Sequence, residues 1–491
     1  MILLALVIPA TLGFLSTRFL LRKSPLPYSW LLSSVMAFPL GLGICSLVLF
    51  WSYVIANGFG RSLTLLVLIV LFIIAMGLQI KASWGRPSPI SLHPGPVLGN
   101  IFNALNPKTN SRTSLFRNWA ITLAALLFVY LFLHYTYYFI GKVVWNIYGG
   151  WDARYFWNLK AKFYFRVPAE WKGMFNPILD WAHPDYPLLL PGAVAWGWIT
   201  AGKELLIWPP IVDYAFFCSL CFLVIWYLSA HVSWWNGLLA GCYLLTVHMF
   251  RFWSTTQYAD IPLTFFFTSA AILLLLAIRS KDKHLFLFSG LLAGLSAWTK
   301  NEGLFFVLWL GLTGAAILLR SRSMTRQEKK SMILYFLGGL LVPLATVVFA
   351  KVVLGVKGGE YIGSGRNLSD YIRLLFFDAA KTKFIALCFL VFKSTYSQWQ
   401  GLWILFLAGL LAGNRDRFKD YRWIFAVLIA GIELGYFVIL HVSPNDPKLQ
   451  VETSLMRLMM HGAALAMVFT FEAIGPLFRA QRKSDPVLSP G

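Results

Sequence analysis

Charged residues are scarce in this chain of 491 residues. Aspartate, glutamate, lysine and arginine make up 13% of the sequence, only 20 residues are acidic, and 58% of all residues are hydrophobic. Roughly a quarter of the residues of a soluble globular domain are charged. The shortage of charge excludes an ordinary soluble domain and makes a lipid bilayer the natural surroundings of this chain.

Cysteine is also rare, with five residues, all in apolar stretches: Cys45, Cys218, Cys221, Cys242 and Cys388. In such stretches a thiol behaves as a small buried hydrophobe. Cys218 and Cys221 form a CxxC pair, but no second pair or neighbouring histidine follows it. We therefore expect no redox or metal centre built on cysteine.

The apolar runs lack the period-2 alternation of transmembrane strands, and the sequence contains no internal repeat. Instead, runs of roughly 18 apolar residues or more recur, each long enough to cross a ~30 Å hydrocarbon core as a helix. The sequence therefore predicts an all-α polytopic membrane protein.

The formal net charge of +22 would suggest a nucleic-acid partner in a soluble protein. Here the basic residues lie mainly in short loops between apolar runs, as the positive-inside rule predicts for cytoplasmic loops. We therefore expect membrane lipid around the protein and no nucleic acid bound to it.

Six basic clusters mark the expected cytoplasmic side: 18–23, 81–118, 281–283, 320–330, 415–422 and 479–483. About 13 transmembrane helices let all six clusters face one way. They are expected near 1–20, 31–56, 62–80, 119–141, 205–229, 235–253, 261–279, 284–298, 303–320, 333–354, 399–413, 422–441 and 455–476. No basic region precedes the first run, so we expect it to be retained as a span.

The apolar stretch at 187–201 would break this parity if it crossed the membrane. It is short and prolines open it, so we interpret it as a juxtamembrane or re-entrant helix. The segment Lys142–Asp185 then becomes a long first outer loop carrying juxtamembrane helices, and 355–397 is expected to lie along the same surface. We expect a multi-pass protein of the inner (plasma) membrane whose unusual polar residues face the periplasmic or extracellular side.

The long outer loop places Asp152 soon after the end of a span, beside Trp151 and Tyr155. Apolar surroundings raise the proton affinity of a carboxylate, which suits a general base. An interfacial aromatic belt with Asp152 as a helix N-cap is the competing interpretation.

Further acidic residues and a histidine are expected on the same face. His183 and Asp185 lie between prolines in DWAHPDYP, where rigid backbone adjoins titratable groups. Asp260 lies at the outer end of a span with Pro262 in the first helical turn, as an ordinary N-cap would. A second carboxylate near Asp152 also suits a metal or an acceptor, so a divalent cation at Asp260 is an open alternative. No other cofactor is expected.

Two cationic residues are predicted near the outer surface. The loop TKNEG is so short that Lys300 and Glu302 must reach the membrane surface or a cavity, although a lysine can also snorkel to head groups. Arg457 lies about one turn inside the last span, with Ser454 and His461 on its helical face. A guanidinium at that depth needs an anionic partner, such as a lipid phosphate.

Five segments in this order carry a family resemblance: WDARYFWNLKAKFY, HPDYPLLLP, QYADIPLTFFF, GLLAGLSAWTKNEGLFF and TSLMRL. They resemble bacterial polytopic glycosyltransferases of the GT-C type, close to the dolichyl-phosphate-mannose-protein mannosyltransferase-like group. The resemblance covers roughly residues 119–476 as a GT-C-like transmembrane catalytic module. It leaves 1–118 as extra N-terminal spans with a basic loop and 477–491 as a cytoplasmic tail.

The resemblance implies an enzyme of the cell envelope that takes a sugar from a polyprenyl-phosphate donor. Its acceptor would be a glycan, lipid or protein on the non-cytoplasmic face, and direct displacement at the anomeric carbon would invert the configuration. The resemblance implies Asp152 as the general base, Asp260 as a second acidic residue, and Arg457 and Lys300 as ligands of the lipid phosphate. The remaining predicted substrate-binding residues are His183, Asp185, Glu302, Trp151 and Ser454.

Other functions fit the same charges. A transporter or flippase would pass a lipid-linked or anionic substrate, although transporters usually show paired halves with interrupted spans. A lipid-linked oligosaccharide ligase or polymerase would use the same class of donor. A non-enzymatic scaffold of an envelope complex would leave Asp152 and Arg457 dispensable.

Overall fold

The computed structural model describes residues 2–24, 26–83, 112–356, 396–411, 421–442 and 451–475, with isolated positions between 367 and 449. Within these ranges the chain forms helices and turns and no strand. Several predicted segments lie outside the described residues: most of the basic loop 81–118, most of the outer segment 355–397, the basic residues 415–420 and the tail 477–491.

Nine helical segments of the described chain are long and apolar enough to cross a membrane. They are Ile2–Leu21, Ser29–Gln79, Thr122–Trp145, Trp208–His231, Asp260–Ser280, Glu302–Arg320, Arg326–Val353, Trp423–Val442 and Thr453–Ile474. The predicted helical, polytopic membrane character is confirmed. The number of thirteen crossings stays a prediction.

The second of these segments consists of two helices. α2 (Ser29–Ala56) and α3 (Gly60–Ser83) are separated by the 3-10 turn η1 (Asn57–Phe59), where Asn57 takes a left-handed φ of 45°. The other long helices are α1 (Ile2–Leu21), α5 (Arg112–Trp145), α8 (Trp208–His231), α11 (Asp260–Ser280), α12 (Lys283–Thr299), α13 (Glu302–Arg320), α14 (Arg326–Val348), α19 (Trp423–Val442) and α21 (Met456–Ile474).

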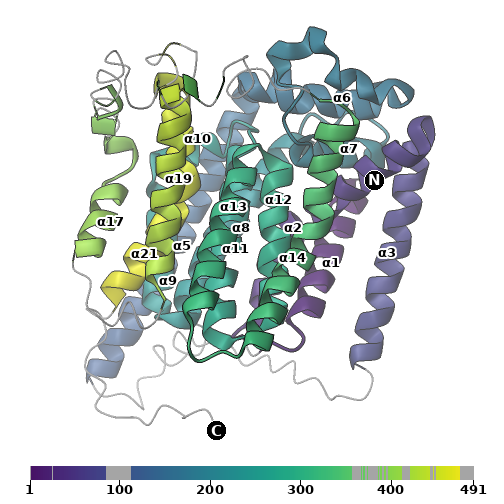
Figure 1. Ribbon diagram of the computed structural model, residues 1–491. Coiled ribbons are helices and arrows are strands. Elements are labelled where there is room, and N and C mark those ends of the chain that lie inside the picture. The colour runs from purple at the N-terminus through teal and green to yellow at the C-terminus, as the bar shows by residue number, and fades with distance from the viewer. Residues whose placement is uncertain are drawn as a thin grey trace.

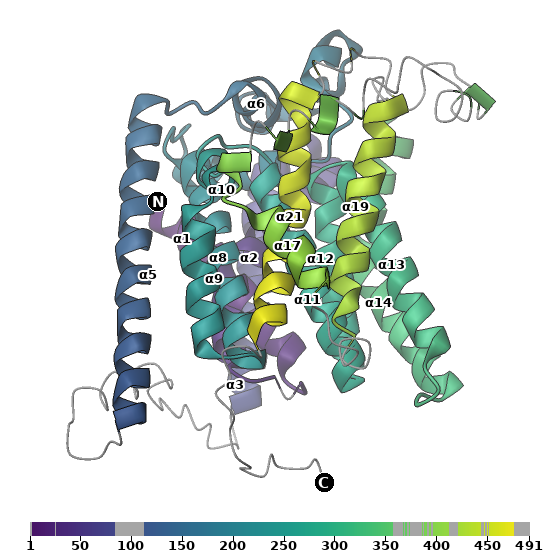
Figure 2. The same cartoon turned by 90° about the vertical axis from the view of Figure 1, so that its left-hand side faces the viewer.

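Shorter elements cover one end of this bundle. Between α5 and α8 the chain forms η3 (Ala153–Trp157), α6 (Asn158–Arg166), η4 (Pro168–Phe175), η5 (Pro177–Ala182) and α7 (Leu189–Ala201). Figure 1 shows α6 and its neighbours above the ends of the long helices, and Figure 2 shows α5 at the margin of the bundle. We call the covered end the α6 end and the opposite end the basic end.

At the basic end, hydrogen bonds hold three loops together. The Ser24 hydroxyl in the α1–α2 loop donates to the Asp282 carboxylate in the α11–α12 loop. The Lys281 ammonium donates to the Ser323 carbonyl in the α13–α14 loop at 3.0 Å. The predicted basic clusters at 18–23, 281–283 and 320–330 therefore share one end of the bundle.

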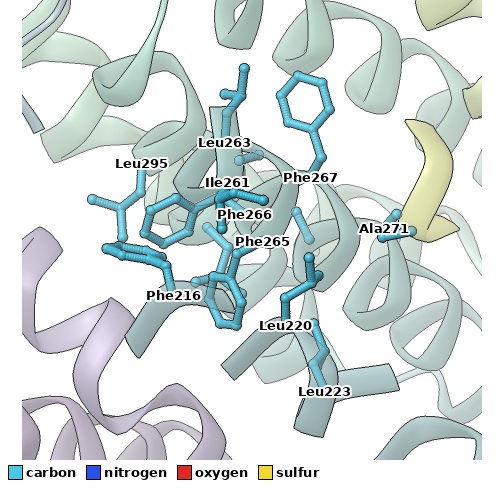
Figure 3. Packing of buried hydrophobic residues seen from close by; sticks show 14 of the residues in the cluster. Phe216, Leu220, Leu223, Ile261, Leu263, Phe265, Phe266, Phe267, Ala271 and Leu295 are labelled. Carbon is cyan, nitrogen blue, oxygen red and sulfur yellow. The ribbon is translucent and has the colours of Figure 1, made fainter. Parts of the chain in front are cut away.

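The core of the bundle lies around α11. Every residue of this helix from Asp260 to Ile278 is buried, which is the pattern of a helix that is apolar on all sides and enclosed by others. Figure 3 shows Phe216 of α8 beside Phe265 and Phe266 of α11, with ring centroids 5.9 and 5.7 Å apart. The first residue of this central helix is Asp260, so its carboxylate starts at the α6 end of the core.

α7 occupies the apolar stretch 187–201, which the sequence predicts to be a helix that does not cross the membrane. It has 13 residues, whereas roughly 20 are needed to cross a bilayer. Just before it, the Asp185 carboxylate accepts a hydrogen bond from Asn301 at 2.6 Å. Just after it, Glu204 pairs with Arg166 at the end of α6, at 2.5 Å. α7 therefore begins and ends at the α6 end, and it is buried over almost its whole length.

Small residues let α12 and α14 approach closely, as in many membrane bundles. A Cβ added to Gly339 of α14 would lie 2.0 Å from the Leu287 carbonyl oxygen, and one on Gly290 of α12 would lie 2.1 Å from the Phe336 carbonyl oxygen. By contrast, a Cβ on the adjacent Gly338 meets only the end of the Leu287 side chain at 3.6 Å. Backbone therefore packs against backbone at this crossing.

We expect Gly339→Ala to destabilise the protein by about 1–3 kcal/mol, because the new methyl group would push α12 and α14 apart. The matched control is Gly338→Ala, which gains the same helix propensity without the clash. Thermal unfolding of both variants in detergent measures the difference. Equal melting temperatures would show that the backbone contact at Gly339 is not limiting.

Candidate functional site

Arg457 brings the two acidic residues of the predicted site together. It lies in the first turn of α21, and its Nη1 donates to Asp152 Oδ2 at 2.5 Å. Its Nε lies 3.9 Å from Asp260 Oδ2. Asp152 precedes η3, whereas Asp260 begins α11. Three segments that are distant in the sequence therefore converge on one guanidinium at the α6 end.

Asp260 is the most enclosed member of this cluster, with a side chain that is 2% exposed. Its Oδ1 lies 3.0 Å from Lys300 Nζ and 3.0 Å from His461 Nε2. A buried carboxylate is tolerated only when it is paired and hydrogen-bonded. The N-cap role considered from the sequence is not observed, because Ala259 occupies that position and no side-chain cap forms.

Lys300 joins Asp260 to a second carboxylate. Its Nζ lies 2.9 Å from Glu302 Oε1, and its side chain is 2% exposed, so the lysine does not snorkel to the surface. Burial alone would lower the pKa of Lys300, but the carboxylates of Asp260 and Glu302 hold this pKa above its ordinary value. Lys300 is therefore a cation at neutral pH.

His461 is a member of the cluster that was not included among the predicted site residues. Its Nε2 faces Asp260, and its Nδ1 lies 2.7 Å from the hydroxyl of Tyr436 in α19. A neutral ring protonated on Nε2 satisfies both contacts, with the tyrosine hydroxyl as donor to Nδ1. The sequence feature that indicates this membership is the position of His461 four residues after Arg457, because this spacing places both side chains on one face of α21.

Two aromatic rings that were not predicted as site residues lie against Arg457. The guanidinium carbon lies 5.1 Å from the ring centre of Tyr258 and 5.5 Å from that of Trp253, within reach of cation–π attraction. The Tyr258 hydroxyl also accepts a hydrogen bond from the Asp152 backbone N–H at 3.2 Å. Trp151, next to Asp152 in the chain, is 62% exposed and lies against Tyr155, and its predicted role in substrate binding stays a prediction.

A break in the predicted span 235–253 places Trp253 in this position. α9 (Trp234–Thr246) ends before Val247, which is extended, and α10 (His248–Trp253) then restarts the helix. The hydrophobic run predicted one continuous helix, because no proline or glycine marks the break. The sequence carried no local signal for it.

Gln257 fixes the loop between α10 and α11 relative to the segment of Asp152. Its φ is 61°, which is unusual for a residue other than glycine. Three hydrogen bonds hold it: its N–H to Asp213 at 2.8 Å, its Nε2 to the Ile147 carbonyl at 2.9 Å, and its Oε1 from Asn158 at 3.0 Å. These bonds stabilise the strained backbone and set the spacing of Asp152 from Asp260.

The HPDYP segment adjoins the cluster without contributing an ion pair to Asp260. The Asp185 carboxylate accepts from Asn301, the residue after Lys300, at 2.6 Å. The His183 carbonyl accepts from the buried ammonium of Lys160 at 2.5 Å, while its imidazole stacks on Tyr186 at 4.8 Å. Asp185 therefore contacts the Lys300 loop, whereas His183 contacts Lys160 of α6 and Tyr186 of its own segment.

Ser454 is the predicted residue with the weakest connection to the cluster. It lies in the π-helical turn η9 (Val451–Leu455), and its hydroxyl is 3.4 Å from that of Thr453. The turn that contains Ser454 is therefore π-helical, whereas its predicted spacing from Arg457 assumes a regular α-helix.

The donors around Asp260 do not fit a divalent cation, the alternative considered for this residue. One carboxylate oxygen faces Lys300 and His461, and the other faces Arg457, so a metal ion would have to displace cationic side chains. Within the described residues, no three His, Cys, Asp or Glu side chains are placed to share a metal. Asp260 instead pairs with the cationic side chains of Lys300 and Arg457.

An apolar cavity lies apart from this cluster. It has a volume of about 370 Å³ and is lined by apolar residues of α11, α12, α13 and α14. Its lining is apolar, like a protein surface that contacts lipid tails, so the charged cluster and not the cavity is the candidate site.

No protein-family model, curated protein or solved structure matches this chain.

Replacing the central carboxylate tests whether the cluster is held electrostatically. We expect Asp260→Asn to cost about 3–5 kcal/mol, because it leaves buried cations without their partner. The double variant Asp260→Asn/Lys300→Gln should recover part of that loss. As a control, Glu204→Gln breaks an exposed pair with Arg166 and should cost less than about 1 kcal/mol. Additive effects at Asp260 and Lys300 in unfolding measurements would contradict the coupling.

We expect the free energy of unfolding to depend on pH because Lys160 is buried. Burial lowers its pKa from 10.5 to about 7, with Asp185 acting in the opposite direction. As pH falls from about 10.5 to 7, the unfolded chain binds a proton on this lysine and the folded chain does not. Stability therefore decreases through that window and levels off below it.

We expect Lys160→Met to remove this part of the slope when the melting temperature is followed from pH 7 to 10. Lys172→Met changes an exposed lysine of the same outer segment and should keep the slope. If Lys160→Met and the unmodified chain show parallel profiles, the lysine is ionised in the folded protein.

Proposed function

We propose that this protein is a membrane glycosyltransferase that transfers a sugar from a polyprenyl-phosphate donor to an acceptor, with Asp152 as the general base. The observation that carries the proposal is the direct contact between the Asp152 carboxylate and the Arg457 guanidinium. A group that can accept a proton and a group that can bind a phosphate are thereby adjacent. Both are partly accessible, with side chains 15% and 18% exposed.

Arg457 retains capacity for an anion while it contacts Asp152. Its Nε makes no hydrogen bond within the described residues, and a guanidinium offers five N–H donors in a planar fork. A donor phosphate that binds this fork competes with Asp152 for the same cation. Binding of the donor therefore loosens the carboxylate from Arg457 and leaves it free to accept a proton.

The chemical step balances with these two groups. The acceptor hydroxyl oxygen attacks the anomeric carbon, its proton passes to Asp152, and the bond from the anomeric carbon to the phosphate oxygen breaks. The electron pair leaves with the polyprenyl phosphate, whose added negative charge Arg457 stabilises. Attack on the face opposite the phosphate inverts the anomeric configuration.

Asp260 and Lys300 support this step without acting as base. Asp260 is enclosed by Lys300, His461 and Arg457, so it remains ionised and has no access to an acceptor hydroxyl. Its role is to hold Arg457 and Lys300 in position, and Lys300 adds positive potential near the phosphate.

The charge distribution supports a site on the non-cytoplasmic face. The basic loops at Arg18–Ser24, Lys281–Lys283 and Arg320–Lys330 gather at one end, and the ion cluster lies at the other. By the positive-inside rule the basic end faces the cytoplasm. The return of α7 to the α6 end supports the parity of thirteen crossings on which this orientation rests.

One feature favours a second candidate, a proton-coupled transporter. Glu433 lies near the middle of α19, its Oε1 has no hydrogen-bond partner within the described residues, and a Cβ on Gly462 of α21 would lie 2.7 Å from it. Ionisable groups at membrane depth often belong to proton or substrate pathways. A transporter would move its substrate into vesicles without consuming a sugar donor.

We expect Asp152→Asn to reduce transfer by at least about a hundredfold, the usual contribution of a general base, while the protein still folds. The control is Asp180→Asn, which changes an exposed aspartate of the same outer segment. Mass spectrometry of envelope glycans is compared between cells lacking the chain and cells restored with each form. Near-normal glycans with Asp152→Asn would rule this residue out as the base.

An assay with purified protein then distinguishes the remaining candidate functions. It is incubated with membranes and with polyprenyl phosphates that carry either a single sugar or an oligosaccharide. Consumption of the monosaccharide donor supports the proposal, and consumption of the oligosaccharide donor alone indicates a ligase or polymerase. If neither donor is consumed, the glycosyltransferase proposal is wrong.

A further inference from the structure

A second group of polar side chains, with the cations Arg251 and Lys142 among them, lies on the other side of α10 from Arg457. His134, Tyr138 and Lys142 are spaced four residues apart on α5 and therefore line one face of that helix. Arg251 of α10 faces them: its guanidinium carbon lies 4.6 Å from the Tyr138 ring centre, and its Nη2 is 3.5 Å from His134 Nδ1. Lys142 Nζ lies 5.6 Å from the same ring.

No carboxylate of the described residues balances the charges of Arg251 and Lys142. Within the described part of the chain, neither Arg251, Lys142 nor His134 forms an ion pair with an acidic side chain, and the buried Nε of Arg251 has no hydrogen-bond partner. Arg166, by comparison, makes two bonds to Glu204, at 2.5 and 2.8 Å. A half-buried guanidinium that lacks an acidic partner attracts an anion from its surroundings.

The surroundings of the cluster are apolar on one side. Side chains on the same side of α5, seven, four and three residues from His134, are exposed: Leu127 at 46%, Tyr130 at 63% and Tyr137 at 79%. All of them belong to the candidate membrane span Thr122–Trp145. A ligand that fits here has a phosphate for the cations and apolar chains for the exposed face.

We propose that the face of α5 formed by His134, Tyr138 and Lys142, together with Arg251 of α10, binds the phosphate group of a membrane lipid. The planar fork of Arg251 takes the phosphate oxygens, Lys142 adds a second positive charge, and the acyl chains lie along Tyr130 and Tyr137. This site is separate from Arg457, and it does not depend on the glycosyltransferase proposal.

The lipid would bridge two helices that meet the catalytic candidate. The Tyr135 hydroxyl of α5 donates to the Ser254 hydroxyl at 2.9 Å, just after α10. Trp253, two residues after Arg251, lies against Arg457. A phosphate held between α5 and Arg251 therefore stabilises the position of α10, and with it the aromatic wall around Arg457.

The test measures lipid binding to the purified full chain by native mass spectrometry. The probes are dioleoyl phosphatidic acid and dioleoylglycerol, which share acyl chains and differ in the phosphate. We expect the unmodified protein to bind the phosphatidic acid about tenfold more tightly. Lys142→Gln/Arg251→Gln should lose most of this preference, and Arg166→Gln, whose arginine already has an acidic partner, should keep it.

Lys142→Gln alone provides a second measurement, because Lys142 is exposed and its replacement leaves the packing of α10 unchanged. A partial loss of the preference is expected for this variant. An unchanged preference in both variants would overturn the proposal. Inorganic phosphate at millimolar concentration serves as a competitor, and displacement of the lipid by it would show a free-anion site and refute lipid binding.

Discussion

The buried pairing of Asp260 with its cations is the interaction on which the arrangement of the α6 end depends. Its carboxylate begins the central helix α11, and it meets Lys300 from the α12–α13 loop and His461 and Arg457 from α21. A charge enclosed by apolar helices is costly alone, so these elements are stable only when all of them arrive together. Arg457 then extends from this anchor to Asp152, and the loop before η3 is held beside it.

Much of this architecture is predictable from the sequence, and the limits have physical causes. The apolar runs locate most long helices because a bilayer demands about 20 apolar residues, and α11 matches the run at 261–279 closely. The charged residues of the site stand out because such residues are rare in spans. The Asp260–His461 contact, the break at Val247 and the Trp253 ring beside Arg457 depend on packing between distant segments, which no local pattern encodes. The π-helical turn at Ser454 likewise replaces the regular helix expected there, and no residue type in the segment indicates it.

The short helix α10 has a double role in this arrangement. One side presents Trp253 to Arg457, and the other presents Arg251 to the ring of Tyr138. The strained Gln257 follows within a few residues and ties the same loop to Asp213, Ile147 and Asn158. Rigid support of this kind places a guanidinium and a carboxylate reproducibly, whereas a mobile loop would spread them over many positions. The strained backbone of Gln257 therefore lies next to the site at which Arg457 and Asp152 must be placed accurately.

The course of α7 has a consequence for biogenesis. Because this helix returns to the end at which it began, its insertion leaves the topology of the following helices unchanged. It is buried beneath neighbours that come both before and after it in the chain, including Trp208 of α8, whose indole donates to the Ala193 carbonyl at 3.0 Å. α7 can therefore complete its packing only when the first turn of α8 is in place beside it. The segment that carries Asp185 leads directly into α7, so its final position next to Asn301 depends on residues that are synthesised later.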